Sequence, residues 1–266
     1  MKPLLGRGRG QSNDDLLAQF ACCRVLLAFD FDGTLAPIVR DRELAVLRAS
    51  TLRLFERLCE LYPCAVVSGR SQRDLTRRLE PAAVEYVVGS QRLEVGRRAA
   101  AFARQVAEAL PILEAALAGY AGLKIDIEDK QYSIAVHYRR SRGKREAQNA
   151  IAQAVARLPA RMRLIPGKLV VNIVPAAAPN KGDAVLALRA QLGADTALYV
   201  GDDVSDEDVF CLDQPGRLLG VRVGRSLRSA APYYLRDQAE IDELLRRLIS
   251  VRAGIAQRER LRRLGG

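Results

Sequence analysis

Two aspartates one residue apart, Asp30 and Asp32, lie at the end of an apolar run. The run begins at Val25, is rich in β-formers and leads into a Gly33-Thr34 turn, which is typical of a buried central strand. Open parallel sheets place their chemistry at the carboxyl ends of their strands, so both carboxylates are candidate catalytic groups. Because successive side chains of a strand point to opposite faces, the chain must leave the pleat at Gly33 if they share one site. The alternative interpretation is an ordinary Asp-Gly turn.

Three further polar segments follow predicted strands or open a predicted helix. They are Ser68-Gly69-Arg70, Lys181 after Asn180, and Gly201-Asp202-Asp203-Val204-Ser205-Asp206-Glu207. Each segment alone is weakly specific, since Ser-Gly-Arg is a common turn and a lysine at a helix start is usually a surface residue. Together they match a phosphoryl-transfer site: a carboxylate can attack phosphorus, a hydroxyl and an ammonium can hold phosphate oxygens, and a carboxylate cluster can hold Mg²⁺.

The elements that position these residues alternate between strand and helix in the first and last thirds of the chain. Strands are predicted at 25–31, 64–68, 86–89, 197–201 and 218–223, and helices at 43–61, 71–79, 181–191, 206–211 and 241–251. This alternation predicts an α/β fold with a parallel sheet covered on both faces.

The middle third has a different pattern. Helices are predicted at 99–117 and 144–158, and alternating strands at 124–128, 132–138, 162–165 and 169–174, the last two joined by a hairpin turn at 166–168. We therefore expect an α+β cap domain at 105–176, inserted into a core made of 24–104 and 177–266. Residues 1–23 are expected to form an N-terminal extension.

Composition excludes several classes of protein. The 266 residues carry a formal net charge of +11, but the chain has no tryptophan and no aromatic-interleaved basic patch, so a nucleic-acid partner is not expected. No apolar run approaches the roughly 18 residues that a membrane span requires, and the basic N-terminus lacks the apolar segment of a secretory signal. We expect a cytoplasmic monomer.

Other catalytic and metal chemistries lack the residues they need. His137 is the only histidine, which argues against a Ser-His-Asp hydrolase and excludes any metal site with two histidines. The five cysteines have no metal-ligand spacing, and we interpret them as buried, reduced thiols.

From Arg24 to about Leu248, the chain resembles the haloacid dehalogenase superfamily and, within it, the trehalose-6-phosphate phosphatase family. The motifs that carry the resemblance are Asp30-Phe31-Asp32-Gly33-Thr34-Leu35, Ser68-Gly69-Arg70, Glu128-Asp129-Lys130 with Tyr132 and His137-Tyr138-Arg139, Asn180-Lys181-Gly182, and Gly201-Asp202-Asp203-Val204-Ser205-Asp206-Glu207. The implied fold is a Rossmann-like haloacid dehalogenase core with a parallel sheet and an inserted cap.

The resemblance implies a role for each core residue. Asp30 would be the nucleophile that forms an aspartyl-phosphate, and Asp32 the general acid and base. Ser68 and Lys181 would hold the transferring phosphoryl group. The implied cofactor is Mg²⁺, held by Asp30, the Asp32 backbone carbonyl and Asp202, with Asp206 or Asp203 nearby. Gly69, Arg70 and Asp203 are further candidate substrate contacts.

In the cap, the family grips the distal sugar with a Glu, a Lys and a second Glu. Glu128 and Lys130 match the first two, and their spacing of two places them on one face of a strand; the alternative is a surface ion pair. Asn172 stands where the second Glu is expected, unless it lies on the outer face of the cap. The family pattern Gly-x-His-Gly-x-Glu is also altered, because Gln91 and Arg92 replace the His and Gly.

These observations imply a Mg²⁺-dependent phosphatase acting on trehalose 6-phosphate, a small-molecule sugar phosphate, with a functional link to a trehalose-6-phosphate synthase. Two alternatives remain open. One is a phosphatase for another glycosyl phosphate, such as glucosylglycerol phosphate or sucrose phosphate. The other is a catalytically silent sugar-phosphate-binding regulator, which would not need to retain Asp32.

Overall fold

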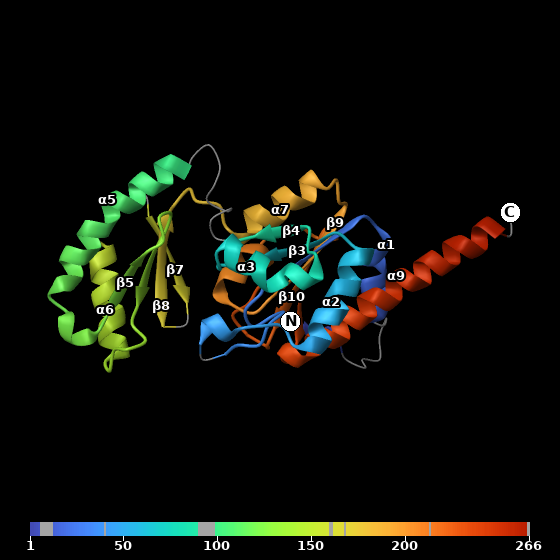
Figure 1. The fold of residues 1–266 in the computed structure, drawn as a ribbon, viewed down its shortest axis with the longest axis horizontal. Helices are drawn as coiled ribbons and strands as arrows, with labels where there is room; N and C mark the ends of the chain where they lie inside the picture. Colours follow the sequence, from blue (N-terminus) through green and yellow to red (C-terminus); the bar gives the residue numbers. More distant parts are fainter. Residues whose placement is uncertain are drawn as a thin grey trace. The chain divides into compact units, whose positions relative to one another are not determined.

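The computed structural model describes residues 1–5, 13–39, 41–89, 99–159, 162–167, 169–212 and 214–264. The chain divides into two compact units (Figure 1). The first comprises Met1–Ser90 and Lys181–Gly266, and the second comprises Gln91–Asn180. The second unit is longer at both ends than the predicted cap segment 105–176. None of the helices in the described part of the chain combines the length and apolarity needed to cross a bilayer.

A seven-stranded parallel sheet forms the centre of the first unit, in the order β1-β11-β10-β9-β2-β3-β4. The strands are β1 (Lys2–Pro3), β2 (Val25–Phe29), β3 (Cys64–Val67), β4 (Tyr86–Val88), β9 (Thr196–Gly201), β10 (Leu218–Val223) and β11 (Tyr233–Leu235). Every residue of β2, β3 and β9 is buried, as expected for central strands of a parallel sheet. The carboxyl ends of β2, β3 and β9 therefore meet at one edge.

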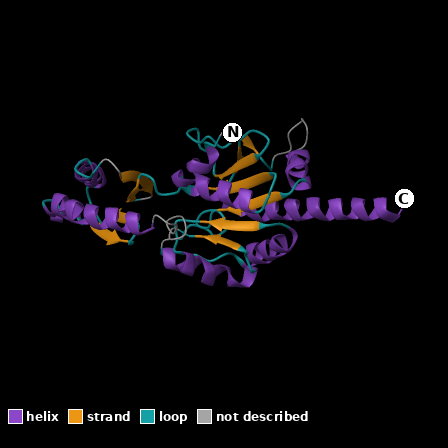
Figure 2. Ribbon diagram, turned by 90° about the horizontal axis from the view of Figure 1, so that it is seen from above, coloured by secondary structure: helices purple, strands orange, loops and turns teal. Residues whose placement is uncertain are grey.

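Helices cover both faces of this sheet (Figure 2). They are α1 (Asn13–Cys22), α2 (Ala49–Leu61), α3 (Gln72–Leu79), α7 (Lys181–Gln191), α8 (Glu207–Phe210) and α9 (Ile241–Leu264), with short 3-10 turns η1 (Arg42–Leu44), η2 (Glu80–Ala82), η4 (Val204–Asp206) and η5 (Gln238–Glu240). On one face, α1 and α2 pack beside α9, where Leu27 and Phe29 of β2 join the main core cluster. On the other face α7 packs against β2, β3 and β9.

The second unit is a four-stranded antiparallel sheet in the order β5-β6-β8-β7, with two helices. Its elements are α5 (Ala99–Ala118), η3 (Ala121–Leu123), β5 (Asp126–Asp129), β6 (Ile134–His137), α6 (Lys144–Val155), β7 (Met162–Gly167) and β8 (Val170–Pro175). Ile134, Val136 and Ile173 pack against both helices in one core cluster. The expected α+β pattern and the β7–β8 hairpin are therefore present.

The structure differs from the sequence-based expectations at three places. Segment 1–23 contains β1 and α1, and both Leu4, which directly follows β1, and Leu17 of α1 are fully buried in the core of the first unit. The helix expected at 43–61 begins at Ala49, because the carbonyls of Glu43 and Ala45 accept hydrogen bonds from the distant Arg78. All five cysteines are free, as expected, but only Cys64 is buried, and Cys22, Cys23 and Cys211 are exposed.

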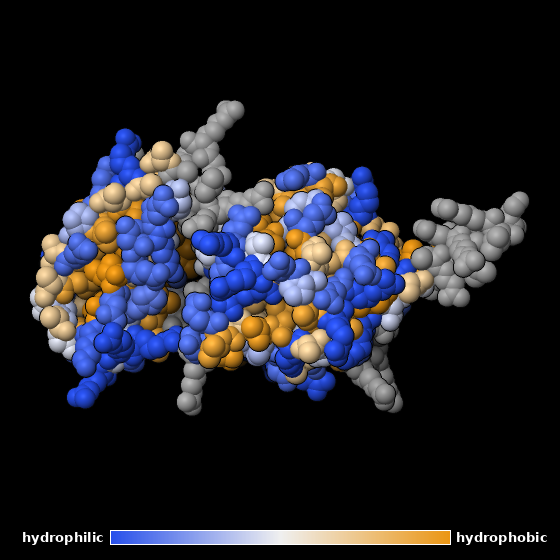
Figure 3. All heavy atoms as spheres, in the orientation of Figure 1, coloured by the Kyte–Doolittle hydropathy of each residue, from blue (hydrophilic) through white to orange (hydrophobic). Residues whose placement is uncertain are grey.

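Hydrophilic and apolar residues are interspersed on the face of the molecule that Figure 3 shows. Among the described residues, the exposed large apolar side chains include a group that follows the Gly33-Thr34 turn in sequence: Ile38, Val39, Leu44 and Val46. The strongly basic composition therefore does not translate into a uniformly hydrophilic surface.

Candidate active site

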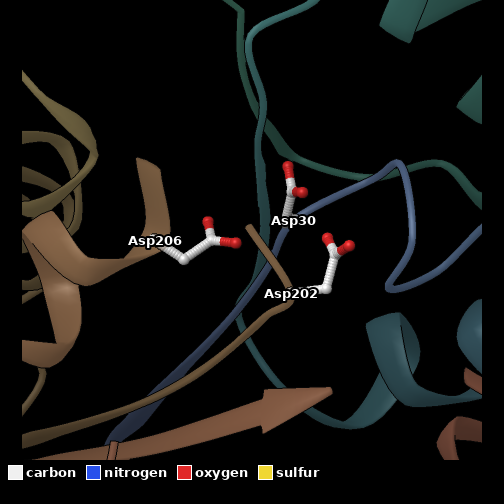
Figure 4. A group of neighbouring side chains, drawn as sticks. All are labelled: Asp30, Asp202 and Asp206. Atoms are coloured by element: carbon white, nitrogen blue, oxygen red, sulfur yellow. The ribbon is translucent and has the colours of Figure 1, made fainter. Parts of the chain in front are cut away.

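Three carboxylates gather at the carboxyl edge of the parallel sheet (Figure 4). Asp30 directly follows β2, Asp202 directly follows the neighbouring strand β9, and Asp206 ends the turn η4. Each offers an oxygen within 4.8 Å of the others. The structure thus brings together residues that are separated by more than 170 positions in the chain, as the strand-end argument predicted.

Lys181 joins this cluster from the first residue of α7. Its Nζ lies 3.0 Å from Asp30 Oδ1 and 2.6 Å from Asp206 Oδ1, and its side chain is 7% exposed. Burial alone would lower the pKa of this ammonium, but Asp206 and Asp30 reverse the effect and raise it, so Lys181 stays charged. A permanent positive charge beside Asp30 suits a site that receives a phosphate.

Asp206 is fixed from three directions. In addition to Lys181, the hydroxyl of Tyr199 donates to Asp206 Oδ1 at 2.6 Å, and the backbone N–H of Asp203 donates to Oδ2 at 2.8 Å. Tyr199 was not among the residues predicted from the sequence, although a hydroxyl-bearing residue within a buried aliphatic strand usually has a hydrogen-bond partner. Asp206 therefore anchors Lys181 as well as contributing charge.

Two glycines allow the carboxylates to approach the backbone. Gly33 has φ +83°, and a Cβ there would lie 2.2 Å from Asp202 Oδ2. At Gly201, a Cβ would lie 2.3 Å from Asp206 Cγ. A side chain at either position would displace a carboxylate of the cluster, which explains the glycine in both motifs.

The carboxylates of the cluster outnumber its ammonium group. Burial raises the pKa of Asp30 to about 7, and burial together with the charges of Asp30 and Asp206 raises that of Asp202 to about 8. When all are ionised, the three carboxylates and the one ammonium together carry two net negative charges. A divalent cation would balance them.

The donors also fit a hard divalent cation. Asp202 Oδ1 is buried without a hydrogen-bond partner among the described residues. Burying an unpaired carboxylate oxygen costs free energy unless a positive group binds it. All three side chains offer carboxylate oxygens, which suit Mg²⁺ better than a soft transition metal.

The second predicted carboxylate, Asp32, is held by Arg70. The Arg70 guanidinium donates from Nε and Nη2 to the two oxygens of Asp32, both at 2.7 Å. Arg70 follows β3 in the same turn as Ser68, whose buried Oγ accepts a hydrogen bond from the Arg70 N–H at 3.4 Å. The sequence indicated Arg70 as a substrate contact, and the ion pair with Asp32 was not foreseen.

Three predicted contacts lie on the second unit. Glu128 pairs in register with Ala135, and Ala135 pairs with Asn172, so the side chains of Glu128 and Asn172 share one face of the sheet. That face is opposite to the core residues Ile134 and Ile173. Lys130 Nζ lies 3.6 Å from Glu128 Oε2.

His137 is an additional group on this face. Its Nε2 lies 2.9 Å from Glu128 Oε2. Partial burial alone would raise the pKa of Glu128, but the contacts with His137 and Lys130 lower it, which keeps the carboxylate ionised. Glu128 therefore carries its negative charge at neutral pH.

The remaining predicted residues are placed differently. Asp203 is exposed and caps η4, outside the group of three carboxylates. Gly69 is exposed and has no atom within 4 Å of an added Cβ. Gln91 and Arg92 lie outside the described residues.

A sequence model described as trehalose-phosphatase matches residues 28–217, which span all the core motifs above. The chain belongs to the trehalose-phosphatase family. It is 30% identical over 264 residues to the trehalose 6-phosphate phosphatase RA3 of Zea mays, covering 88% of this chain and 72% of that relative. It is 31% identical over 196 residues to the trehalose-phosphate phosphatase of Mycobacterium tuberculosis H37Rv, covering 68% of this chain and 49% of that relative.

Solved structures of this family have the same fold. The C-terminal domain of the Candida albicans trehalose-6-phosphate phosphatase aligns with a TM-score of 0.73 and 22% identity, covering 94% of this chain and 98% of that one. A crystal form of the Aspergillus fumigatus enzyme aligns with a TM-score of 0.65 and 22% identity, covering 94% and 99%. The expected haloacid dehalogenase fold, with its parallel sheet and cap, is confirmed.

Proposed function

We propose that this protein is a Mg²⁺-dependent phosphatase that hydrolyses trehalose 6-phosphate to trehalose and inorganic phosphate. The observation that carries the proposal is the group of Asp30 and Asp202, at the ends of adjoining strands, with Lys181 at the start of α7, in a member of the trehalose-phosphatase family. The same proposal includes that the protein is a cytoplasmic monomer and that it acts on the product of a trehalose-6-phosphate synthase.

Asp30 is the nucleophile of this proposal. One of its oxygens attacks phosphorus, the P–O bond to the sugar breaks, and Asp32 gives its proton to the departing sugar oxygen. Water then attacks the aspartyl-phosphate, Asp32 takes a proton from that water, and phosphate leaves with Asp30 restored.

The surrounding residues hold the phosphate and its charge. Lys181 neutralises negative charge on the phosphoryl oxygens, and the Ser68 hydroxyl donates a hydrogen bond to them. Asp30, the Asp32 carbonyl and Asp202 would hold Mg²⁺, with Asp206 adding charge beside them. When bound, Mg²⁺ would supply the positive charge that lets an anionic nucleophile approach an anionic phosphate.

A panel of phosphate esters tests the substrate. We expect phosphate release from trehalose 6-phosphate with a higher kcat/KM than from sucrose 6-phosphate, glucosylglycerol phosphate or glucose 6-phosphate. Preference for one of the other glycosyl phosphates would reassign the substrate without changing the chemistry. Binding without turnover of any ester would favour a catalytically silent regulator. Such a regulator would not need to retain Asp30, Asp32 and Lys181.

The alternative glycosyl phosphates are favoured by one observation, Asn172, which shares a sheet face with Glu128. Asparagine retains an acceptor but lacks the charge of the glutamate that the family places there, and charge-assisted hydrogen bonds are the stronger ones. If the substrate is trehalose 6-phosphate, Asn172→Glu is expected to raise kcat/KM by about tenfold, for one added charged contact.

Asn172→Gln is the matched control for this substitution, because it adds the same length without the charge. Steady-state kinetics of both variants on the ester panel separate the outcomes. A fall in activity on the preferred ester would indicate a substrate that the asparagine amide recognises. Identical kinetics of wild type and Asn172→Glu on every ester would show that this position does not face the sugar.

A further inference from the structure

Arg70 lies between two carboxylates. Its side chain is only 2% exposed. Nε and Nη2 donate to Asp32, while Nη1 donates to Asp74 Oδ2 at 2.7 Å. A planar guanidinium that binds a carboxylate through two parallel hydrogen bonds also fixes the plane of that carboxylate. The orientation of Asp32 therefore depends on the orientation of Arg70.

Asp74 is itself firmly held, in the first turn of α3. Its backbone N–H donates to the Ser71 side chain, which caps the helix. Its Oδ1 accepts from Arg78 Nε at 2.8 Å, and Arg78 Nη1 donates to the Ala45 carbonyl at 2.6 Å. The side chains of Asp74 and Arg78 are 18% and 6% exposed. A continuous chain of ion pairs, Asp32–Arg70–Asp74–Arg78, thus runs from the active site to the segment before α2.

The charge on Asp74 is secure. Burial alone would raise its pKa, but hydrogen bonds from Arg78 and Arg70 lower it to about 2. Asp74 is therefore an anion throughout the range in which an enzyme works, and it balances a buried cation that Asp32 also pairs with.

We propose that Asp74 is a positioning residue for proton transfer by Asp32, acting through Arg70 to hold the Asp32 carboxylate in its working orientation. The inference rests on the proposed function, because it assigns Asp74 to the proton transfer of that reaction. Proton transfer is sensitive to placement, and a misplacement of about 1 Å can cost on the order of 10²-fold in rate. Asp74 lies outside the group of Asp30, Asp202 and Asp206, and it is linked to Asp32 through Arg70, so we expect its effect to pass through Asp32.

A purely structural role is the competing explanation, since Asp74 also stabilises the start of α3. The two explanations differ in what happens when Asp32 no longer transfers protons. Replacing a purely structural residue lowers kcat in any background. Replacing a residue that acts through Asp32 lowers kcat only while Asp32 is present, and has no further effect on kcat once Asp32 is replaced.

The experiment is a double-mutant cycle with Asp74→Asn and Asp32→Asn, measured as kcat on trehalose 6-phosphate with Mg²⁺. Asp74→Asn alone is expected to lower kcat by about tenfold with little change in KM. This loss is smaller than the loss expected when the acid itself is removed, which is on the order of 10²-fold or more. In the Asp32→Asn background it is expected to change kcat by less than about twofold.

The leaving group gives an independent measurement. A sugar alkoxide needs a proton as it departs, while the phenolate of p-nitrophenyl phosphate does not. Asp74→Asn should therefore slow release from p-nitrophenyl phosphate much less than from trehalose 6-phosphate. Arg77→Gln is the matched control, since Arg77 binds the same carboxylate at 3.1 Å from the solvent side and is 71% exposed; neither substrate should be affected.

The outcomes separate this inference from the proposed function. An equal loss from Asp74→Asn in both backgrounds, or no loss at all, overturns the inference while the phosphatase assignment stands. A wild-type protein that releases phosphate from no ester overturns both. If Asp74→Asn fails to fold, Asp74→Glu retains the charge and shifts the carboxylate by one methylene, and the same cycle applies.

Discussion

Asp30→Asn is expected to abolish phosphate release and leave the fold intact. Asparagine has nearly the shape of aspartate and keeps an oxygen to accept the hydrogen bond from Lys181, which lies 3.0 Å away. An amide cannot form the acyl-phosphate, so the first step of the proposed mechanism cannot take place. Residual kcat below about one per cent of wild type is the expected result, in line with the losses that follow removal of a nucleophile.

Asp195→Asn is a suitable control, because Asp195 is an exposed carboxylate of the same unit, 53% exposed and paired with Arg24. It should retain full activity. Thermal unfolding of both variants, together with mass analysis to exclude deamidation of the new asparagine, completes the measurement. Activity of Asp30→Asn above the one per cent level, in a protein of confirmed mass, would show that Asp30 is not the nucleophile.

Much of the core could be predicted because each strand and the carboxylate that follows it are encoded by a short, continuous stretch of sequence. The apolar run before Asp30 forms β2, fully buried along its length, and the strand before Asp202 forms β9 beside it. Once the alternation of strands and helices indicates a parallel sheet, the strand ends must share an edge. Asp30 and Asp202 could therefore be assigned to one site before any coordinates were known.

What could not be predicted depends on contacts between distant segments. The two-residue strand β1 is too short to carry a pattern, and it exists because it pairs with β11 more than 200 positions away. The segment 43–48 has a helical sequence pattern, but the Arg78 side chain donates hydrogen bonds to two of its backbone carbonyls, those of Glu43 and Ala45. The Asp32–Arg70 pair likewise joins residues 38 positions apart. Sequence identified the residue types at these positions but not their partners.

Removal of divalent cations is the second change with a large expected effect: phosphate release should cease in excess EDTA and return with Mg²⁺. When all three are ionised, Asp30, Asp202 and Asp206 carry two more negative charges than Lys181 can balance, and Asp202 Oδ1 has no hydrogen-bond partner among the described residues. An anionic phosphate would not enter such a site unaided. Ca²⁺ is expected to inhibit, because its larger and looser shell of ligands would misplace the nucleophile.

The same charges predict how stability depends on pH without metal. The pKa values of Asp30 and Asp202 in the folded protein, about 7 and about 8, lie above the ordinary value of 3.8. Between these limits the folded state binds more protons than the unfolded state, so the free energy of unfolding falls as pH rises from about 4 to about 8. The Tm in EDTA should decline over that range, and the gain in Tm on adding Mg²⁺ should be largest at its upper end.

Asp202→Asn tests whether the cation acts at this cluster. The variant removes a carboxyl group whose pKa is raised by burial and by the charges of Asp30 and Asp206. Its Tm in EDTA should therefore be less sensitive to pH than that of the wild type, and Mg²⁺ should raise its Tm less. Asp195→Asn, outside the cluster, should respond to Mg²⁺ as the wild type does. Undiminished activity in excess EDTA would contradict the metal requirement. A Mg²⁺-induced rise in Tm that survives Asp202→Asn unchanged would place the cation elsewhere in the protein, because a carboxylate that does not bind the cation contributes nothing to that rise.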